Sequence, residues 1–223
     1  MTCYFITGID TDIGKTHATG ILARHLLSSG KSVITQKLIQ TGITGDIADD
    51  IITHRRLMGV DLHDVDKDGT TCPITLTKPA SPHLSARLEN RTIDVWQIDH
   101  ATHLLTQQFD LILLEGAGGV LVPLTDEMLT LDYVAQHGYL VIVVTSARLG
   151  SINHTLLTLE VIHARGLRLF AVVFNHHFDT DPDISTDTLD YLKNHVARHY
   201  PNALFMQLKG NEIVGFDYMM DKF

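Results

Sequence analysis

Thr2-Cys-Tyr-Phe-Ile-Thr-Gly8-Ile-Asp-Thr-Asp-Ile-Gly-Lys-Thr16 opens the chain and decides its fold. Residues 2–6 predict a buried strand, and the residues after Thr16 predict a helix. Between them lies a glycine-flanked loop that ends in Lys-Thr. In this order, N–H groups of the loop and of the helix N-terminus point at an anion, the Lys15 ammonium neutralises charge, and the Thr16 hydroxyl can ligate Mg²⁺. The stretch therefore predicts a phosphate-binding loop for a nucleoside triphosphate.

This loop departs from the usual phosphate-loop spacing. Five residues separate Gly8 from Gly14 where four are usual, and Ile9 stands in place of the first glycine. Asp10 and Asp12 also put two carboxylates in the loop, and negative charge beside a phosphate site needs a compensating Mg²⁺ ion or substrate amine. The alternative interpretation is an ordinary strand-to-helix turn with a glycine and a solvated lysine.

Length and composition predict one α/β domain over residues 1–223, because 223 residues with 44% hydrophobic content can bury a substantial core. A formal charge of −9 argues against a nucleic-acid partner. Binding a phosphate backbone requires a basic face, and the sequence has no Lys/Arg cluster beyond Arg55-Arg56.

The sequence also predicts a soluble cytoplasmic protein with no membrane partner. Cys3 and Cys72 have no metal or redox spacing, no charged targeting segment precedes the first strand, and no apolar run approaches the roughly 20 residues of a membrane span. None of the 14 histidines lies in an HExxH or paired Cys/His motif. We therefore expect most histidines to be surface or capping residues.

Short apolar runs recur along the chain and alternate with helical patterns. Near-continuous apolar runs are typical of a parallel sheet covered on both faces, so the fold class is predicted to be a doubly wound, mostly parallel α/β sheet. The further strands are predicted at residues 32–36, 111–114, 140–145, 169–174 and 203–206, and the helices at residues 17–29, 51–58, 93–108, 129–137, 153–165 and 185–200.

In such a sheet, ligands bind beyond the carboxyl ends of the strands. The residues at these ends are polar here, and we expect one crevice to collect them. They are the phosphate loop, Lys37 to Gly42, Glu115 to Gly119, Ser146 to His154 and Asn175 to His177.

Three of these side chains could bind a ligand or an ion, and for Glu115 and Lys37 the alternative is an ordinary surface residue. Glu115 can reach a Mg²⁺ ion on the phosphates, or it is a solvated residue at a strand end. Lys37 can stabilise charge on the γ-phosphate, or it is an isolated surface lysine. The paired donor and acceptor of the Asn175 amide can bind a base edge.

Asp46, Asp49 and Asp50 precede the helix predicted at residues 51–58. They are expected to cap this helix and complement its dipole. One of them could also supply a second carboxylate for Mg²⁺.

Taken together, these segments resemble dethiobiotin synthetase, the ATP-dependent enzyme family of biotin synthesis. The five-residue spacing of the loop is this family's own form, and EGAGG and GSINHTLLT are the specific motifs. The matching segments are GIDTDIGKT (8–16), KLIQTG (37–42), ADDI (48–51), SPHLSARLE (81–89), EGAGG with LVPLTD (115–119 and 121–126) and GSINHTLLT (150–158).

The resemblance implies a P-loop NTPase architecture with ATP as co-substrate and Mg²⁺ as cofactor. It implies Lys37, Lys15 and Thr11 as catalytic residues, Thr41 as a substrate contact, and Thr16, Asp50 and Glu115 as Mg²⁺ ligands. Asn175 would bind adenine. The ATP-binding set it implies is Asp12, Ile13, Gly14, Lys15, Thr16, His17, Asp50, Glu115, Gly116, Ala117, Gly118, Asn175 and His176.

The resemblance further implies a homodimer with a shared active site, in which Gly150, Ser151 and Asn153 of one subunit reach the carboxylate of the substrate in the other. Two departures affect other contacts. Leu38 replaces a proline that often follows the lysine, and residues 205–208 lack the Gly-x-x-Pro element that commonly borders the adenine.

The implied reaction joins CO₂ to 7,8-diaminononanoate as a carbamate, phosphorylates it with ATP, and closes the ring to dethiobiotin with release of ADP and phosphate. The main rival is a switch ATPase of the partitioning type, which usually has a second lysine early in the loop, where this chain has Ile9 and Asp10. A second rival is a related amidating ligase of corrinoid synthesis, but this chain is too short for the glutaminase domain of those enzymes.

Overall fold

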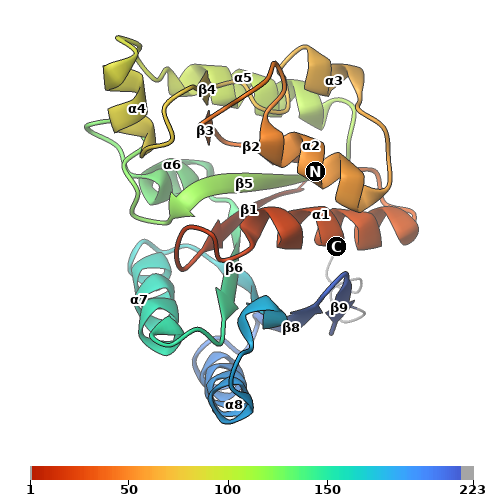
Figure 1. The fold of residues 1–223 in the computed structure, drawn as a ribbon, viewed down its shortest axis with the longest axis vertical. Coiled ribbons are helices and arrows are strands. Elements are labelled where there is room, and N and C mark those ends of the chain that lie inside the picture. Colours follow the sequence, from red (N-terminus) through yellow and green to blue (C-terminus); the bar gives the residue numbers. More distant parts are fainter. Residues whose placement is uncertain (1, 217–223) are drawn as a thin grey trace.

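The computed structural model describes residues 2–216 and has a central sheet with helices on both faces (Figure 1). Every neighbouring pair of strands is parallel except the last, so the predicted α/β, mostly parallel sheet is confirmed. The strand order is β2 (Val33–Lys37), β5 (Leu111–Gly119), β1 (Thr2–Gly8), β6 (Leu140–Ser146), β7 (Leu169–Asn175), β8 (Leu204–Lys209) and β9 (Glu212–Val214).

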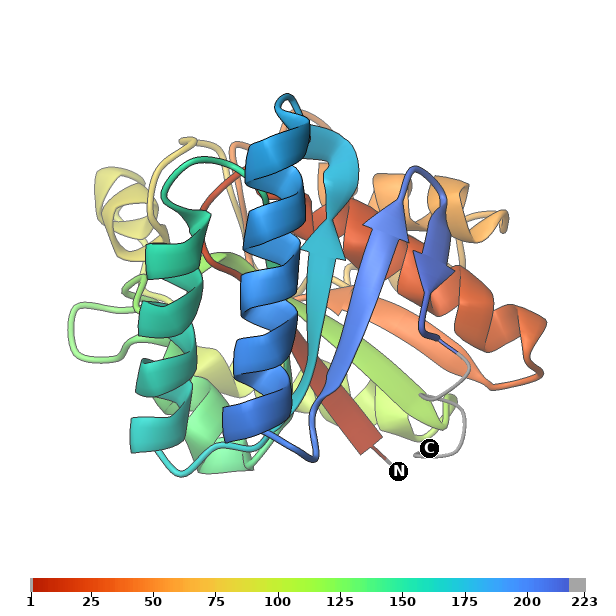
Figure 2. The ribbon, with the colours of Figure 1, turned by 90° about the horizontal axis from the view of Figure 1, so that it is seen from below.

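Successive strand residues point alternately into two hydrophobic cores, one on each face of the sheet, which explains why the strands are apolar throughout. Tyr4 and Ile6 pack with α1 (Lys15–Ser28) and Met58 of α2 (Asp49–Met58) on one face. Phe5 points to the opposite face. The helices on that second face are α5 (Val95–Thr106), α6 (Thr130–His137), α7 (Ser151–Ala164) and α8 (Pro182–His199), and Figure 2 shows α7 and α8 side by side across the sheet.

The six predicted helices and six predicted strands are present, with ends that shift by a few residues. The backbone conformation explains where two of the helices end. Gly30 after α1 and Gly166 after α7 have φ values of 80° and 66°, a conformation that favours glycine. At the N-terminus of α8, the Asp181 side chain accepts hydrogen bonds from the N–H groups of Asp183 and Ile184 and caps the helix.

The segment between β2 and α5 contains elements that the periodicity does not predict. Two-residue strands and helices of four to seven residues are too short to display a clear hydrophobic period. These elements are β3 (Gln40–Thr41), which pairs with β4 (Thr75–Leu76), and the helices α3 (Asp64–Lys67) and α4 (Pro82–Leu88); the other short elements are the strand β9 and the 3₁₀ helix η1 (His176–Phe178).

A buried ion pair fixes α2 and α3 against β2. Arg55 is 2% exposed and donates from Nε and Nη2 to the two Asp66 carboxylate oxygens at 2.8 Å each. It also donates to Thr35 Oγ1 at 2.7 Å. Burial alone raises the pKa of Asp66, but the hydrogen bonds and charge of Arg55 outweigh it and hold this pKa below its usual value. Arg55 is therefore a core residue, and the Arg55-Arg56 pair forms no basic patch.

None of the helices among residues 2–216 is both long enough and apolar enough to cross a membrane. Residues 217–223, part of the C-terminal segment, lie outside the described residues.

Candidate active site

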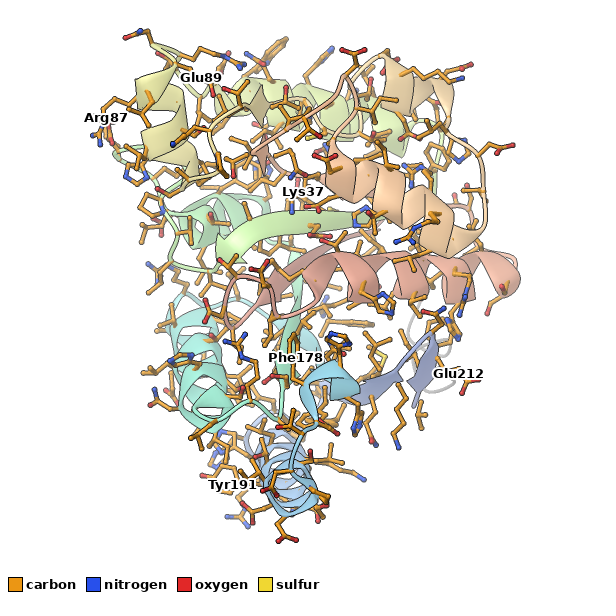
Figure 3. The ribbon with its side chains drawn as sticks, in the orientation of Figure 1. Lys37, Arg87, Glu89, Phe178, Tyr191 and Glu212 are labelled. Carbon is orange, nitrogen blue, oxygen red and sulfur yellow. The ribbon has the colours of Figure 1, made fainter. Side chains whose placement is uncertain are left out.

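A cavity of about 1500 Å³ lies where the carboxyl ends of β1, β2, β5 and β7 meet. In Figure 3, Lys37 lies beside β5 and α2, and Phe178 lies on the opposite side of α1. Most of the predicted site residues line this one cavity: Thr11, Asp12, Gly14, Lys15, Thr16, His17, Lys37, Thr41, Asp50, Glu115, Ala117, Gly118, Asn175 and His176.

Two other predicted residues do not line the cavity, but their backbone carbonyls accept hydrogen bonds from residues that do. The Ile13 carbonyl accepts a hydrogen bond from Asn175 Nδ2 at 3.0 Å, and the Gly116 carbonyl accepts one from Lys37 Nζ at 3.1 Å. The crevice expected from the strand ends is therefore present for four of the five segments, but the expectation is wrong for residues 146–154, none of which lines it.

The phosphate loop folds tightly around its lysine. Lys15 Nζ donates to the Asp10 carbonyl at 2.9 Å, so the ammonium lies over the loop it belongs to. Gly8 permits this close approach, because a Cβ there would come within 2.4 Å of Ile13 Cγ2. Burial, reinforced by repulsion from Lys37, lowers the pKa of Lys15 to about 8. An anion bound in the loop would favour its charged form again.

Lys37 sits between two carboxylates. It lies opposite Glu115 in the register of β2 and β5, and its Nζ is 2.8 Å from Glu115 Oε1 and 2.5 Å from Asp50 Oδ2. Burial alone lowers the pKa of Lys37, but the two carboxylates outweigh it and raise the pKa above its usual value. The plain interpretation of Lys37 as a solvated lysine is therefore wrong, because the residue is 5% exposed and paired with two carboxylates.

Glu115 is the centre of this network, and it is completely buried. Its Oε1 accepts hydrogen bonds from Thr16 Oγ1 at 2.9 Å and from Lys37 Nζ, while its Oε2 lies 2.7 Å from His54 Nε2. Burial alone raises the pKa of Glu115, but the Lys37 charge and the hydrogen bonds from His54 and Lys37 bring it well below its usual range. Glu115 is thus an ionised carboxylate and not the solvated strand-end residue of the alternative interpretation.

His54 contacts the site through Glu115, and the sequence analysis did not single it out. It is fully buried on α2, so the expectation that the histidines lie mostly on the surface or at helix ends fails at this position. One sequence signal was available: His54 follows Asp50 by four residues, which places both on one face of a helix.

The aspartates near the start of α2 do not cap this helix. Ala48 is the N-cap residue and makes no side-chain cap bond, so the expected capping is wrong. Asp49 and Asp50 lie in the first turn, where their charge complements the helix dipole as expected.

The oxygen donors around Lys37 suit a hard divalent cation. Thr16 contributes a hydroxyl oxygen and Asp50 and Glu115 contribute carboxylates, the ligands that Mg²⁺ takes together with substrate phosphates. Thr16 Oγ1 and Glu115 Oε1 lie 2.9 Å apart, close enough to face one ion. The residues present therefore fit the implied cofactor.

Both ends of the Asn175 amide are hydrogen-bonded within the protein. Its Nδ2 group donates to the Ile13 carbonyl, and its Oδ1 accepts from the His177 N–H at 3.1 Å. Next to it, His176 contacts Asp179 Oδ2 at 2.6 Å and Gln207 Oε1 at 2.9 Å. In this structure Asn175 braces the phosphate loop, and its expected contact with adenine stays a prediction.

The turn at the start of α7 lies outside this chain's own cavity. Gly150 has a φ of 92° and Asn153 is exposed, whereas Ser151 is buried with its hydroxyl 3.2 Å from Ser146 Oγ. The neighbouring Leu149 is 91% exposed. Gly150 and Asn153 are therefore open to solvent, whereas Ser151 is not.

The cavity is also lined by residues that the sequence analysis did not expect there. Residues 79–82 line it at the start of α4, and Phe178, Lys209 and Gly210 line it near the β8–β9 hairpin. His17 ties this hairpin to α1, because its Nε2 lies 2.8 Å from the Gly210 carbonyl oxygen.

The parallel sheet, the loop after β1 and the Lys15-Thr16 pair at the start of α1 define a P-loop NTPase. A family model described as an AAA domain matches residues 2–206. The solved structure of pNOB8 ParA bound to nonspecific DNA has the same fold, with a TM-score of 0.53 at 16% identity over 90% of this chain and 78% of that one.

Sequence relatives identify the family. ATP-dependent dethiobiotin synthetase BioD 2 of Pasteurella multocida is 52% identical over 202 residues, 91% of this chain and 94% of that protein. ATP-dependent dethiobiotin synthetase BioD of Chlorobaculum tepidum is 50% identical over 194 residues, 87% of this chain and 81% of that protein. The chain belongs to the ATP-dependent dethiobiotin synthetase family of ligases, and the resemblance drawn from its motifs is confirmed.

Proposed function

We propose that this chain converts 7,8-diaminononanoate, CO₂ and ATP to dethiobiotin, ADP and phosphate through a carbamate and a carbamic-phosphoric anhydride. The observation that carries the proposal is the shared cavity, in which Lys15 of the phosphate loop and Lys37 of β2 face the same space. The likeness to ParA, at 16% identity, shows the fold alone and does not support the partitioning-switch hypothesis.

The chemistry consists of three bond-forming steps. One amine of the substrate attacks CO₂ and loses a proton to give a carbamate. A carbamate oxygen then attacks the γ-phosphorus and ADP leaves. The second amine attacks the carbamoyl carbon, loses its proton and expels phosphate, which closes the cyclic urea.

The task of the protein is to bring two anions together in line. Lys15 neutralises the phosphates, and Lys37, held by Asp50 and Glu115, offers its ammonium to the carbamate and the γ-phosphate together. Thr16, Asp50 and Glu115 would hold Mg²⁺, which when bound neutralises charge on the phosphate oxygens. Thr41 lines the side of the cavity where we place the diamine.

Labelled bicarbonate tests the proposal. The chain, incubated with ATP, Mg²⁺, 7,8-diaminononanoate and ¹⁴C-bicarbonate, is expected to place label in a cyclic urea in proportion to the ADP released. ATP hydrolysis without labelled ring would favour the switch hypothesis instead.

Thr16→Val and Glu115→Gln are expected to raise the Mg²⁺ concentration needed for half-maximal turnover, because each removes an oxygen ligand. Mg²⁺ titrations of turnover at saturating ATP measure this effect. Thr44→Val, a change to an exposed hydroxyl that donates to Asp49 Oδ1, is the matched control for Thr16→Val. Wild-type titration curves for both site variants would remove Thr16 and Glu115 from the metal site.

We further propose a homodimer in which Gly150, Ser151 and Asn153 act on the carboxylate of the substrate in the other subunit. An Asn153→Ala protein and an inactive Lys37→Ala protein should then recover activity on mixing, because one hybrid site contains both intact residues. Activity measured after subunit exchange checks this, with each variant alone as control. Lack of recovery in verified mixed dimers contradicts a shared site.

The cytoplasmic location and the single domain over residues 1–223 remain predictions.

A further inference from the structure

Glu115 receives its hydrogen bonds from three different elements, and the bond from α2 has no place in the reaction described above. Both Glu115 and His54 are completely buried, and His54 Nε2 is 2.7 Å from Glu115 Oε2. Oε1 is the oxygen that faces Thr16 and Lys37. His54 therefore occupies the one carboxylate oxygen that does not face the reacting groups.

The hydrogen-bond pattern fixes the tautomer of His54. Oε2 of an ionised carboxylate can only accept, so Nε2 carries the proton and donates it. Nδ1 is buried, and it has no hydrogen-bond partner among the described residues. The one hydrogen bond of this ring that the described residues provide is therefore the one that Nε2 donates to Glu115 Oε2.

The backbone geometry makes this contact rigid. Asp50 and His54 are one turn apart on α2, so the same helix face contacts Lys37 through Asp50 and Glu115 through His54. The next residue, Arg55, anchors the helix to Asp66 and Thr35. A carboxylate that is held by one oxygen cannot rotate freely about its last torsion, so its other oxygen keeps its direction.

We propose that His54 is a positioning residue, which donates from Nε2 to Glu115 Oε2 and thereby keeps Oε1 turned toward Thr16 and Lys37. This inference rests on the proposed function, because it assigns to His54 the orientation of a carboxylate used in that reaction. Without the His54 bond, Glu115 can turn Oε1 away from Thr16, and Lys37 loses the fixed partner that aims its ammonium into the cavity.

A matched pair of substitutions separates this role from packing. The amide nitrogen of glutamine is as many bonds from Cα as His Nε2, whereas that of asparagine corresponds to Nδ1 and does not reach Glu115. His54→Gln should keep kcat within about threefold of wild type. His54→Asn should lower kcat by about 10–100-fold, the usual effect of removing a hydrogen bond that orients a ligating carboxylate, while the Kd for ATP changes little. His100→Asn, on the exposed face of α5, is the control.

Three measurements are needed: steady-state turnover, ATP binding by calorimetry, and thermal unfolding. A purely structural role would lower Tm in His54→Asn but leave the kcat of the folded protein unchanged. Equal kcat values in the Gln and Asn variants would overturn the proposal. Loss of turnover in the wild type itself would instead overturn the proposed function, so the two failures are distinguishable.

A measurement on the unchanged protein tests the proposal independently of how the variants fold. ¹⁵N-labelled histidine in the wild-type chain should give a His54 signal with the proton on Nε2, assigned by its absence from His54→Gln or, if that variant does not fold, from through-bond correlations. A proton on Nδ1 alone would contradict the proposal, because Nε2 could not then donate to Glu115.

Discussion

Lys15→Ala is expected to lower kcat for ring formation by at least about 10²-fold, the typical effect of removing a preorganised charged donor from the transition state. The ammonium lies over the phosphate loop, and its contact with the β- and γ-phosphate oxygens should strengthen as charge shifts toward the leaving ADP. Because the loop N–H groups remain, ATP binding should fall much less than kcat. Single-turnover rates at saturating ATP measure the loss.

The control for this variant is Lys193→Ala, since Lys193 is an exposed lysine of α8 away from the cavity. It should leave kcat and Tm unchanged. A Lys15→Ala protein that kept kcat and changed only KM would show that Lys15 binds ground state and transition state alike, contrary to the role proposed for it.

Lys37→Met is expected to abolish most turnover while ATP affinity stays near the wild-type value. The substitution keeps the apolar stem and removes the charge. ATP in the ground state is held by the loop from Gly14 to Thr16, whereas Lys37 is the lining cation that we place beside the attacking carbamate oxygen. Calorimetry for ATP and a separate assay for dethiobiotin measure the two effects.

Stability requires its own control in this experiment, because Lys37 is paired with two carboxylates. Removing one partner of such a buried network costs on the order of 3 kcal/mol of unfolding free energy. The double variant Lys37→Met with Glu115→Gln removes the charges of Lys37 and of the fully buried Glu115, and it should recover part of that stability. It should stay inactive. Recovery of turnover in the double variant would mean that Lys37 acts on stability alone.

The sequence predicted the fold well because its strands are buried on both faces. Residues 111–114 and 140–145 are apolar without alternation, a pattern that is typical of a sheet covered by helices on both sides. The loop from Gly8 to Thr16 then placed the cavity at the carboxyl ends of the strands. Lengths of two to four residues explain why β3, β4 and α3 were not predicted.

The pairing of individual side chains could not be predicted in the same way. His54 and Glu115 are 61 residues apart, and Arg55 and Asp66 are 11 residues apart across a turn. Only the tertiary fold brings such groups together, so a helix-face histidine in the sequence does not reveal that it is buried. For Asn175, the sequence indicated a polar residue at a strand end but not that its amide is bonded to the phosphate loop.

The central claim is that a carbamate oxygen, and not water, attacks the γ-phosphorus. The most direct test is a reaction with ATP, Mg²⁺, 7,8-diaminononanoate and ¹⁸O-bicarbonate in unlabelled water, quenched before the label exchanges, with the released phosphate analysed by mass spectrometry. Because the oxygen that bridges carbon and phosphorus leaves with phosphate, we predict one ¹⁸O atom in each phosphate, corrected for the label remaining in CO₂. Phosphate that carries no ¹⁸O while labelled CO₂ is still present would show that water is the attacking group, and would contradict the account.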